Sequence, residues 1–457
     1  MQHPLQTLDL AVGVDDFDDD AFEDCDDRDS ILTVDTEPSV FTMTKNSHNS
    51  LDAYSSTLQI QPKQVPVRLI KRPGFPKTRT VNLVQEIFTD KPIYALASSP
   101  QGDYLALGGD ELRVYRLLSH TFSDMSTCAV FDKDSFVLFK PKQQGAVIDI
   151  SWTSKRPGIF YTAGMDKTAA LWSVKTSDPL MLFPHPDVVS SLAVCPKDDR
   201  ILVTGCIDRR LRVWSVAVRK VIGFVDLTHP ITSVCFTPSG KSIVAGTASG
   251  HVHIYWLDLS DPLTANLKYF SQIHVRSSRG RNAAGTAKIS GLQCVNGPNG
   301  DPLLLVTSND SRVRLYRLRD KELKVKFHGI LNEDSQLRAS THGDLVICPS
   351  EDGRVGVWKM PSLVSDSSNV FLNIADSLRG RRLVDSLVSF RAAIGKTNED
   401  DQFTEGQPLS SALFLSDTVL TFLSDANLRS RSNNFTKLIV TADMTGRIKV
   451  FEWADPQ

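Results

Sequence analysis

The chain has 457 residues, of which 41% are hydrophobic and 23% are charged, and its formal net charge is −2. This composition is sufficient for a globular core, and no apolar run approaches the roughly 18 residues that a membrane-spanning helix needs. The N-terminus turns acidic almost at once, which excludes the basic-then-apolar pattern of a signal peptide. We therefore expect a soluble cytoplasmic protein that has no transmembrane segment.

Acidic residues are concentrated near the start of the chain. Nine of the thirteen residues at positions 15–27 are Asp or Glu, and the rest of residues 1–60 is polar and lacks sustained periodicity. Such a run repels itself, so residues 1–60 are expected to form a disordered acidic tail. It could solvate the protein, offer a contact motif anchored by Phe17 and Phe22, or cover the chain's own basic surface. Residues 61–80 are basic and contain prolines, and we expect an extended lead-in.

One sequence pattern recurs seven times along the chain. A strand of small residues enters a polar turn containing Asp or Gly, and an alternating strand then ends on an aromatic residue. The seven aromatic residues are Tyr115, Trp172, Trp214, Tyr255, Tyr316, Trp358 and Phe451. The short intervals between them are 41 or 42 residues, which is typical of a four-stranded propeller blade of about 40–45 residues. The repeat therefore predicts an all-β, seven-bladed β-propeller.

The last copy of the pattern is one strand short. The printed chain stops at FEWADPQ, directly after the third strand of that copy. A blade of three strands would leave an unpaired edge. The apolar run VNLVQEIF, residues 81–88, belongs to no copy. We therefore expect residues 81–88 to complete the last blade, so that the propeller spans residues 81–457.

Three intervals are longer than one blade requires, which places insertions at residues 118–145, 272–288 and 361–408. The first is expected to hold an outer strand and a loop. In the third, five apolar residues have the spacing of one helix face: Ile374, Leu378, Leu383, Leu387 and Phe390. Such an amphipathic helix could pack against its own propeller, or it could bind a partner or a membrane surface.

The repeated pattern resembles the WD repeat, and the resemblance covers roughly residues 81–457. One copy matches the hydrogen-bonded tetrad of that family at all four positions. His185 precedes the first strand, Thr204 lies in the second, Asp208 lies in the turn, and Trp214 lies in the third. We expect His185 to be a buried structural group, and the four side chains to form one buried hydrogen-bonded chain.

Arginines are concentrated in two neighbouring stretches. In the strand of the fifth copy, three are expected to take mostly outward, solvated positions: Arg312, Arg314 and Arg317. The loop HVRSSRGRN holds three more within six residues: Arg276, Arg279 and Arg281. Serines and a glycine beside them let backbone amides approach an anion, so this loop could hold a phosphate, a phosphoinositide head group or a carboxylate cluster. A solvated loop or a set of intramolecular ion pairs is the structural alternative.

Motifs for catalysis, metal binding and nucleotide binding are absent from the sequence. The GKS at 240–242 lacks the preceding glycine of a phosphate-binding loop, and no GxSxG motif occurs. The seven cysteines form no CxxC pair, and the ten histidines show no metal-ligand spacing. We therefore expect no catalytic residue, no metal and no cofactor, and cysteines that are buried inert thiols.

The phrases QIHVRSSRGRN, KISGLQ and LVTSNDSRVRLYRLRDKEL are similar to the WD-repeat-containing protein 44 family, over about residues 140–360. Members of that family are rabphilin-like effectors of a Rab GTPase. The resemblance implies a scaffold that links Rab-type small GTPases to vesicle membranes, located peripherally on endosomal or Golgi-derived vesicles. In that family the Rab-binding segment lies in a long region before the propeller, whereas residues 1–80 precede it here.

Two other classes of propeller function stay open. One is a nuclear or ribosome-assembly propeller that binds RNA–protein complexes through the positive charge outside the acidic tail. The basic clusters lack interleaved exposed aromatic residues, so nucleic acid is not the expected partner. The other is a substrate receptor of a ubiquitin ligase, although no adaptor-binding helix-loop motif is recognisable in the sequence.

Overall fold

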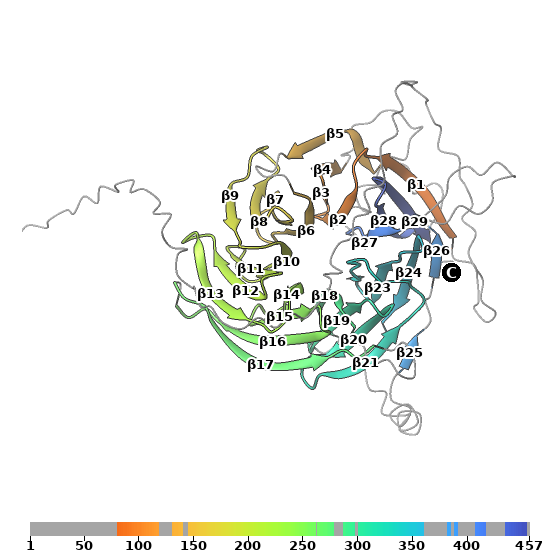
Figure 1. Cartoon of the computed structure of the whole chain (residues 1–457). Helices are drawn as coiled ribbons and strands as arrows, with labels where there is room; N and C mark the ends of the chain where they lie inside the picture. Colours follow the sequence, from red (N-terminus) through yellow and green to blue (C-terminus); the bar gives the residue numbers. More distant parts are fainter. Residues whose placement is uncertain are drawn as a thin grey trace, which may run out of the picture. The chain divides into compact units, whose positions relative to one another are not determined.

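The computed structural model describes residues 80–117, 130–139, 145–261, 263–277, 287–297, 300–360, 382–384, 388–391, 407–416 and 435–454. All of them belong to one compact unit, residues 60–457. Within this unit the described strands form seven sheets that follow one another around a ring (Figure 1). The predicted all-β, seven-bladed propeller is therefore confirmed. The acidic tail at residues 1–60 lies outside the described residues.

The first four blades each consist of four consecutive antiparallel strands. Blade 1 comprises β2 (Ile93–Ser98), β3 (Tyr104–Gly109), β4 (Leu112–Leu117) and β5 (Phe131–Phe139). Blade 2 comprises β6 (Val147–Trp152), β7 (Ile159–Gly164), β8 (Thr168–Ser173) and β9 (Met181–Pro184). Blade 3 comprises β10 (Val189–Val194), β11 (Ile201–Cys206), β12 (Arg210–Ser215) and β13 (Lys220–Asp226). Blade 4 comprises β14 (Ile231–Phe236), β15 (Ser242–Thr247), β16 (His251–Asp258) and β17 (Asn266–His274).

In the last three blades the strands are not all consecutive, because β25 joins blade 5, β26 follows β24 in blade 6, and β1 joins blade 7. Blade 5 comprises β18 (Ile289–Asn296), β19 (Pro302–Ser308), β20 (Arg312–Arg317), β21 (Glu322–Phe327) and β25 (Arg382–Val384). Blade 6 comprises β22 (Ser340–His342), β23 (Leu345–Pro349), β24 (Arg354–Lys359) and β26 (Val388–Arg391). Blade 7 comprises β27 (Leu409–Phe414), β28 (Phe435–Asp443), β29 (Arg447–Ala454) and β1 (Thr80–Phe88).

Strand β1 closes the ring, as the unpaired edge of the last repeat predicted. It pairs antiparallel with β29, with Val81 opposite Trp453 and Ile87 opposite Ile448. Both Val81 and Ile87 are buried, and each joins a core cluster that contains residues of a neighbouring blade. The start of the described chain thus supplies the outer strand of the last blade.

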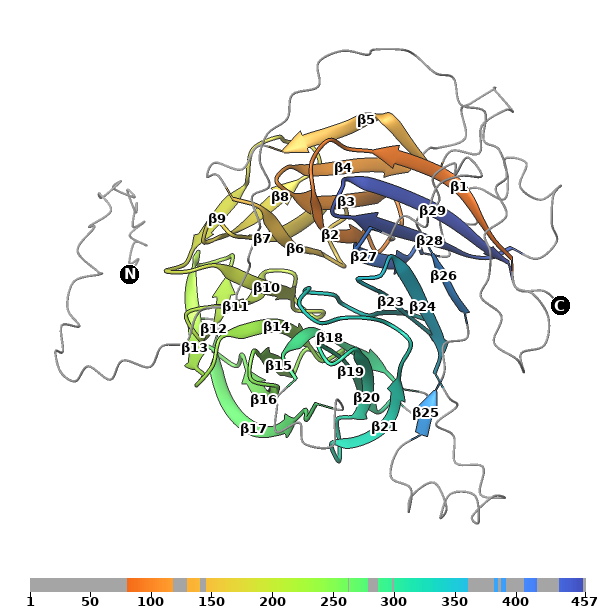
Figure 2. The ribbon, with the colours of Figure 1, turned by 45° about the vertical axis from the view of Figure 1, so that its right-hand side comes forward.

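The expected helix in residues 361–408 is wrong where this insertion is described. Residues 382–384 form β25, which pairs in parallel with β21, and residues 388–391 form β26, which pairs antiparallel with β24 (Figure 2). The edges of two blades offer unpaired backbone groups, and pairing with them outweighs the local helical spacing of the apolar residues. None of the described residues forms a helix long and apolar enough to cross a membrane.

The core lies between adjacent sheets. One cluster joins Val203 and Val213 of blade 3 to Ile231 and Ile243 of blade 4, and the other blade interfaces are built in the same way. All seven aromatic residues that define the repeat are buried. The alternating third strand of each repeat therefore faces a neighbouring blade with its apolar side chains.

Replacing Ile87 with alanine tests the role of the closing strand. Ile87 is 4% exposed, so its loss should lower the free energy of unfolding by about 2–5 kcal/mol. The neighbouring Phe88 is 65% exposed, and Phe88→Ala should change it by no more than about 0.5 kcal/mol. Urea denaturation of both variants measures the difference. Equal effects would contradict a closing role for this strand.

Candidate anion-binding site

The structure brings three of the four expected tetrad residues together. The His185 imidazole Nε2 lies 2.9 Å from the Thr204 hydroxyl, which also accepts a hydrogen bond of 3.0 Å from Trp214 Nε1. His185 Nδ1 lies 2.8 Å from the carbonyl oxygen of Phe183. A neutral imidazole that donates from Nδ1 and accepts at Nε2 satisfies all of these partners. Burial favours that form, because it lowers the pKa of His185 to about 4.

Asp208, the fourth expected member of the tetrad, forms its hydrogen bonds with arginines and not with His185. Its carboxylate accepts hydrogen bonds of 3.2 and 2.6 Å from the Arg212 guanidinium and one of 3.0 Å from the Arg210 amide. Burial alone would raise the pKa of Asp208, but these bonds outweigh it and lower the pKa. Both ring nitrogens of His185 already have partners, so Asp208 binds the arginine four positions along the chain.

The same ion pair recurs in blade 5, where it is fully buried. The Arg314 and Asp310 side chains are 2% and 1% exposed. Arg314 Nη1 donates to Asp310 Oδ1 at 2.9 Å, and Nη2 donates to Oδ2. The expectation that Arg314 points outward into solvent is therefore wrong. The turn places a carboxylate four residues before Arg314, and a buried guanidinium needs such a partner.

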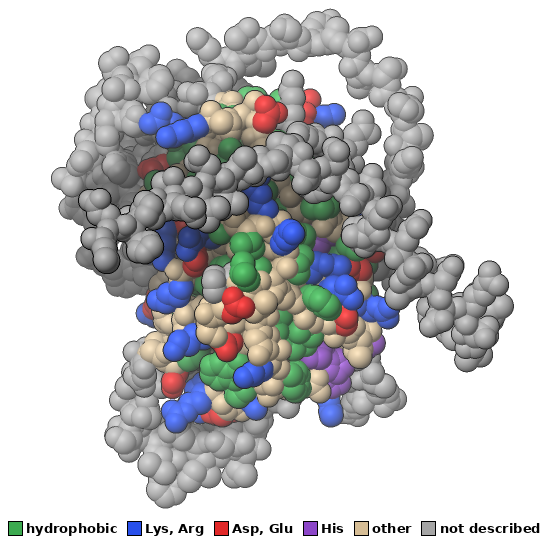
Figure 3. All heavy atoms as spheres, turned by 90° about the vertical axis from the view of Figure 1, so that its left-hand side faces the viewer, with side chains coloured by type: hydrophobic (Ala, Val, Ile, Leu, Met, Phe, Trp, Pro, Cys, Tyr) green, Lys and Arg blue, Asp and Glu red, His purple; other side chains and the backbone are tan. Residues whose placement is uncertain are grey.

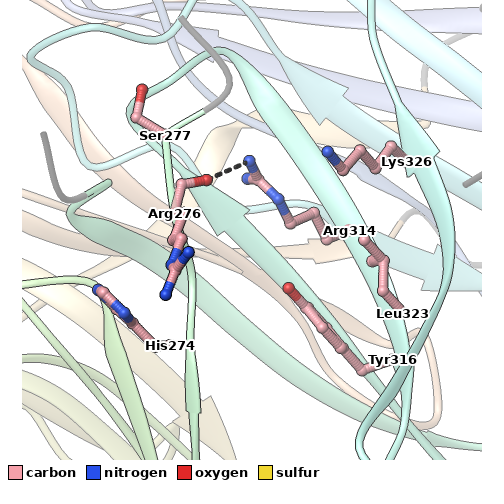
Figure 4. Close-up of a pocket in the computed structure, with 7 residues that line it drawn as sticks. All are labelled: His274, Arg276, Ser277, Arg314, Tyr316, Leu323 and Lys326. Carbon is pink, nitrogen blue, oxygen red and sulfur yellow. Dashed lines mark hydrogen bonds between the residues drawn. The ribbon is translucent and has the colours of Figure 1, made fainter. Parts of the chain in front are cut away.

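Arg314 also holds the start of the arginine-rich loop. Its Nη2 donates a hydrogen bond of 3.2 Å to the carbonyl oxygen of Arg276, as Figure 4 shows. The donor belongs to β20 of blade 5, and the acceptor follows β17 of blade 4. The two arginine-rich stretches of the sequence thus meet in space. Arg279 and Arg281 lie outside the described residues.

A cavity of about 460 Å³ lies at this junction. Its lining residues are His274, Arg276, Ser277, Arg314, Tyr316, Leu323 and Lys326 (Figure 4). Lys326 is the register partner of Arg314 in the adjacent strand, so both side chains lie on the same face of the sheet. None of the lining residues is acidic, and the Asp310 carboxylate is already engaged by Arg314. The Arg314–Asp310 pair has no net charge, so Arg276 and Lys326 supply the positive charge of the described lining, which suits an anion.

A group of stacked histidines lies beside this cavity along blade 4. The His251 and His274 rings are stacked with centroids 4.5 Å apart, and His229 and His253 adjoin His251 at 6.2 and 6.0 Å. Figure 3 shows histidines gathered at the surface of the molecule. Burial, and then neighbouring His274 and His229, lower the pKa of His251. Stacked rings do not point their nitrogens at one centre, and no metal-binding group of three or more His, Cys, Asp or Glu occurs among the described residues.

The loop between β21 and β22 bridges the inner strands of several blades, which the sequence did not reveal. Arg338 pairs with Asp149 of β6, and Asp149 also accepts a hydrogen bond of 2.8 Å from the Leu192 amide of β10. Gln336 donates hydrogen bonds of 2.8 and 2.7 Å to the carbonyl oxygens of Thr232 and Ser290. Side chains of the protein itself therefore connect the inner strands of blades 2 to 5.

Comparison with known proteins agrees with this architecture. The family model "WD domain, G-beta repeat" matches residues 177–215 and 223–255. WD repeat-containing protein 44 of Xenopus laevis is 32% identical over 319 residues, which cover 67% of this chain and 32% of that protein. The 2-deoxy-glucose resistant protein 2 of Saccharomyces cerevisiae is 30% identical over 309 residues, which cover 62% of this chain and 34% of that protein. The E3 ubiquitin-protein ligase COP1 of Arabidopsis thaliana is 23% identical over 212 residues, which cover 46% of this chain and 28% of that protein.

The ring of seven sheets and the matched repeats define a WD-repeat β-propeller, which is a protein-interaction scaffold. The chain belongs to the WD-repeat family of WD repeat-containing protein 44. It spans about a third of the length of each of these three relatives.

The low pKa of His185 predicts a specific pH dependence of stability. The folded state keeps this imidazole neutral down to about pH 4, whereas an unfolded histidine takes up a proton near pH 6.5. Unfolding therefore binds a proton between these values, and stability should fall by on the order of 3 kcal/mol as the pH drops from about 6.5 to 4. Urea denaturation across this range should show a shallower fall for His185→Gln. The same slope in both proteins would contradict the assignment.

Replacing Asp310 with asparagine tests the buried ion pair. It leaves the Arg314 charge buried without a carboxylate, which should destabilise the protein by about 3–5 kcal/mol. Asp320 forms an ion pair with Arg317 at the surface, where its side chain is 39% exposed, and Asp320→Asn should cost no more than about 1 kcal/mol. Thermal or urea unfolding compares the two variants. A cost for Asp310→Asn as small as that for Asp320→Asn would show that the pair is not buried.

Proposed function

We propose that this protein is a non-catalytic WD-repeat adaptor that links Rab-type small GTPases to vesicle membranes. Its anion-recognising patch is formed by Arg276, Arg279 and Arg281 together with the cavity between blades 4 and 5. The observation that carries the proposal is the cationic cavity, of whose described lining residues none is acidic. Membership of the family of WD repeat-containing protein 44 supports the trafficking role.

The geometry of Arg276 suits recognition of an external anion. Its side chain is exposed, while its backbone is fixed by the hydrogen bond from the buried Arg314. The fixed backbone holds the guanidinium beside the cavity, and its planar group can contact two phosphate oxygens at once. The Ser277 hydroxyl lines the same cavity, so a phosphate would meet charged and neutral donors together.

The position of the cavity suits recruitment of a partner. It lies at the blade end where β17 leads into β18 and where the turn before β20 carries Asp310. Loops at the ends of rigid strands commonly carry binding residues, because the scaffold holds them in place. A phosphoinositide head group on an anionic membrane is the phosphate source that we propose here, and protein partners would use the remaining loops.

A triple Arg276→Ala, Arg279→Ala, Arg281→Ala variant tests this function. Charge-assisted hydrogen bonds contribute roughly 1.5–3 kcal/mol each, so binding to vesicles that contain phosphatidylinositol phosphates should weaken at least tenfold. The melting temperature should change little, because Arg276 is exposed. Flotation with such vesicles and affinity purification with mass spectrometry measure lipid binding and recovery of Rab-type GTPases.

The matched control replaces three exposed arginines in other blades, Arg116, Arg200 and Arg219. This control should retain vesicle binding and Rab recovery. Unchanged binding in the test variant, or a large fall in its melting temperature, would assign the three loop arginines a structural role. Recovery of ubiquitin-ligase subunits or ribosomal proteins in place of Rab-type GTPases would contradict the trafficking role.

A further inference from the structure

The outer edge of blade 4 exposes a group of aromatic side chains that the fold does not require. We call Trp256, Tyr269 and Phe270 the aromatic edge; their exposed fractions are 47%, 57% and 44%. The Trp256 and Phe270 rings pack edge to face with centroids 5.3 Å apart. The other five tryptophans of the chain are buried, each 9% exposed or less. Trp256 therefore differs from all of them in its surroundings.

An irregularity in the sheet creates this exposure. Tyr269 pairs with Tyr255, and Ser271 pairs with Ile254, so Phe270 is the extra residue of a bulge between β16 and β17. A bulge lets two successive side chains leave the normal alternation. Tyr269 and Phe270 consequently both face solvent. Exposed aromatic groups of this kind mark interaction sites more often than single scattered apolar residues do.

Two lysines adjoin the aromatic edge. Lys268 is the register partner of Trp256, and the Lys321 amine lies 5.5 Å from the centre of the Phe270 ring. The stretch from Asn266 to Ser277 contains no acidic residue. The carboxylates of the preceding turn accept hydrogen bonds from that turn: Asp258 from Ser260, and Asp261 from Leu263 and Thr264.

Strand β17 connects the aromatic edge to the cationic cavity. Phe270 belongs to β17, His274 ends that strand and lines the cavity, and Arg276 lies two residues beyond it. Six residues of extended chain separate Phe270 from Arg276, which corresponds to about 20 Å. Both can touch one flat surface only when the edge of blade 4 lies along that surface.

We propose that the outer edge of blade 4 docks on an anionic bilayer, with the aromatic edge in the headgroup region and the cavity on a phosphate-bearing headgroup. Aromatic rings and lysines are the combination that favours a membrane–water interface, where the rings are partly buried and the amines reach phosphate. This inference rests on the proposed membrane role and adds the orientation of the propeller. It assigns the bilayer, and not a second protein, to the aromatic edge.

Trp256 provides an intrinsic probe for the test. The full chain is titrated with phosphatidylcholine vesicles that contain either no phosphatidylinositol phosphates or about 5% of them. The second composition gives the vesicles a modest anionic surface charge. With the phosphoinositide vesicles, tryptophan emission should shift to the blue and should be quenched by lipids brominated on their acyl chains. Both changes should disappear in Trp256→Phe.

Matched variants measure the contribution to binding. Phe270→Ser should weaken vesicle binding at least fivefold. Phe136→Ser is the control, because Phe136 is 38% exposed on an outer strand of blade 1 and also lies beneath a cation, with Arg113 5.0 Å from its ring centre. This control should bind as the natural protein does, and both variants should melt normally.

The outcomes separate this inference from the proposed function. Vesicle binding that depends on Arg276 but leaves Trp256 emission unchanged would overturn the docking edge and leave the adaptor proposal standing. Absence of any vesicle binding would overturn both. A blue shift that follows protein concentration and ignores vesicles would show a second copy of the chain on this edge, and would also overturn the inference.

Discussion

The pairing of β1 with β29 is the constraint on which the ring depends. Each sheet of the propeller contributes to two core interfaces, so an incomplete last blade would expose apolar surface on blades 6, 7 and 1 together. The closing strand removes this problem because Val81 and Ile87 enter the clusters on either side of blade 7. Residues more than 350 positions apart in sequence thereby form one sheet, and the loops of all the blades gain a rigid frame.

Within that frame, buried polar groups determine where individual loops start. Arg314 is neutralised by Asp310 and in turn holds the carbonyl group of Arg276. A buried pair of this kind contributes little net stability when compared with apolar residues of the same size. Its role is better explained by position, because it fixes the backbone of Arg276 at the junction of two blades. The structural pair and the exposed arginine therefore have complementary roles.

Much of the architecture could be predicted from the sequence, because repeated patterns report local strand structure. The blade number and the closing strand follow from spacing and alternation, and the burial of His185 follows from the resemblance to the WD-repeat tetrad. The burial of Arg314 could not be predicted in this way. It depends on an ion pair with Asp310 and on a hydrogen bond to the carbonyl oxygen of Arg276 in another blade. The strands at residues 382–384 and 388–391 escaped prediction for a similar reason: their partners, β21 and β24, are distant in sequence. Likewise, the bulge at Phe270 is visible only in the pairing register.

Hydrogen–deuterium exchange of the full chain, with and without phosphoinositide vesicles, tests the central claim that blades 4 and 5 carry the anion-binding surface. Backbone amides that become sheltered by a bound bilayer exchange more slowly, and peptides locate them along the chain. We expect slower exchange in β17 and in the strands around the cavity, β20 and β21, with blades 1 and 2 unchanged. Slower exchange confined to other blades, despite vesicle binding, would contradict the account.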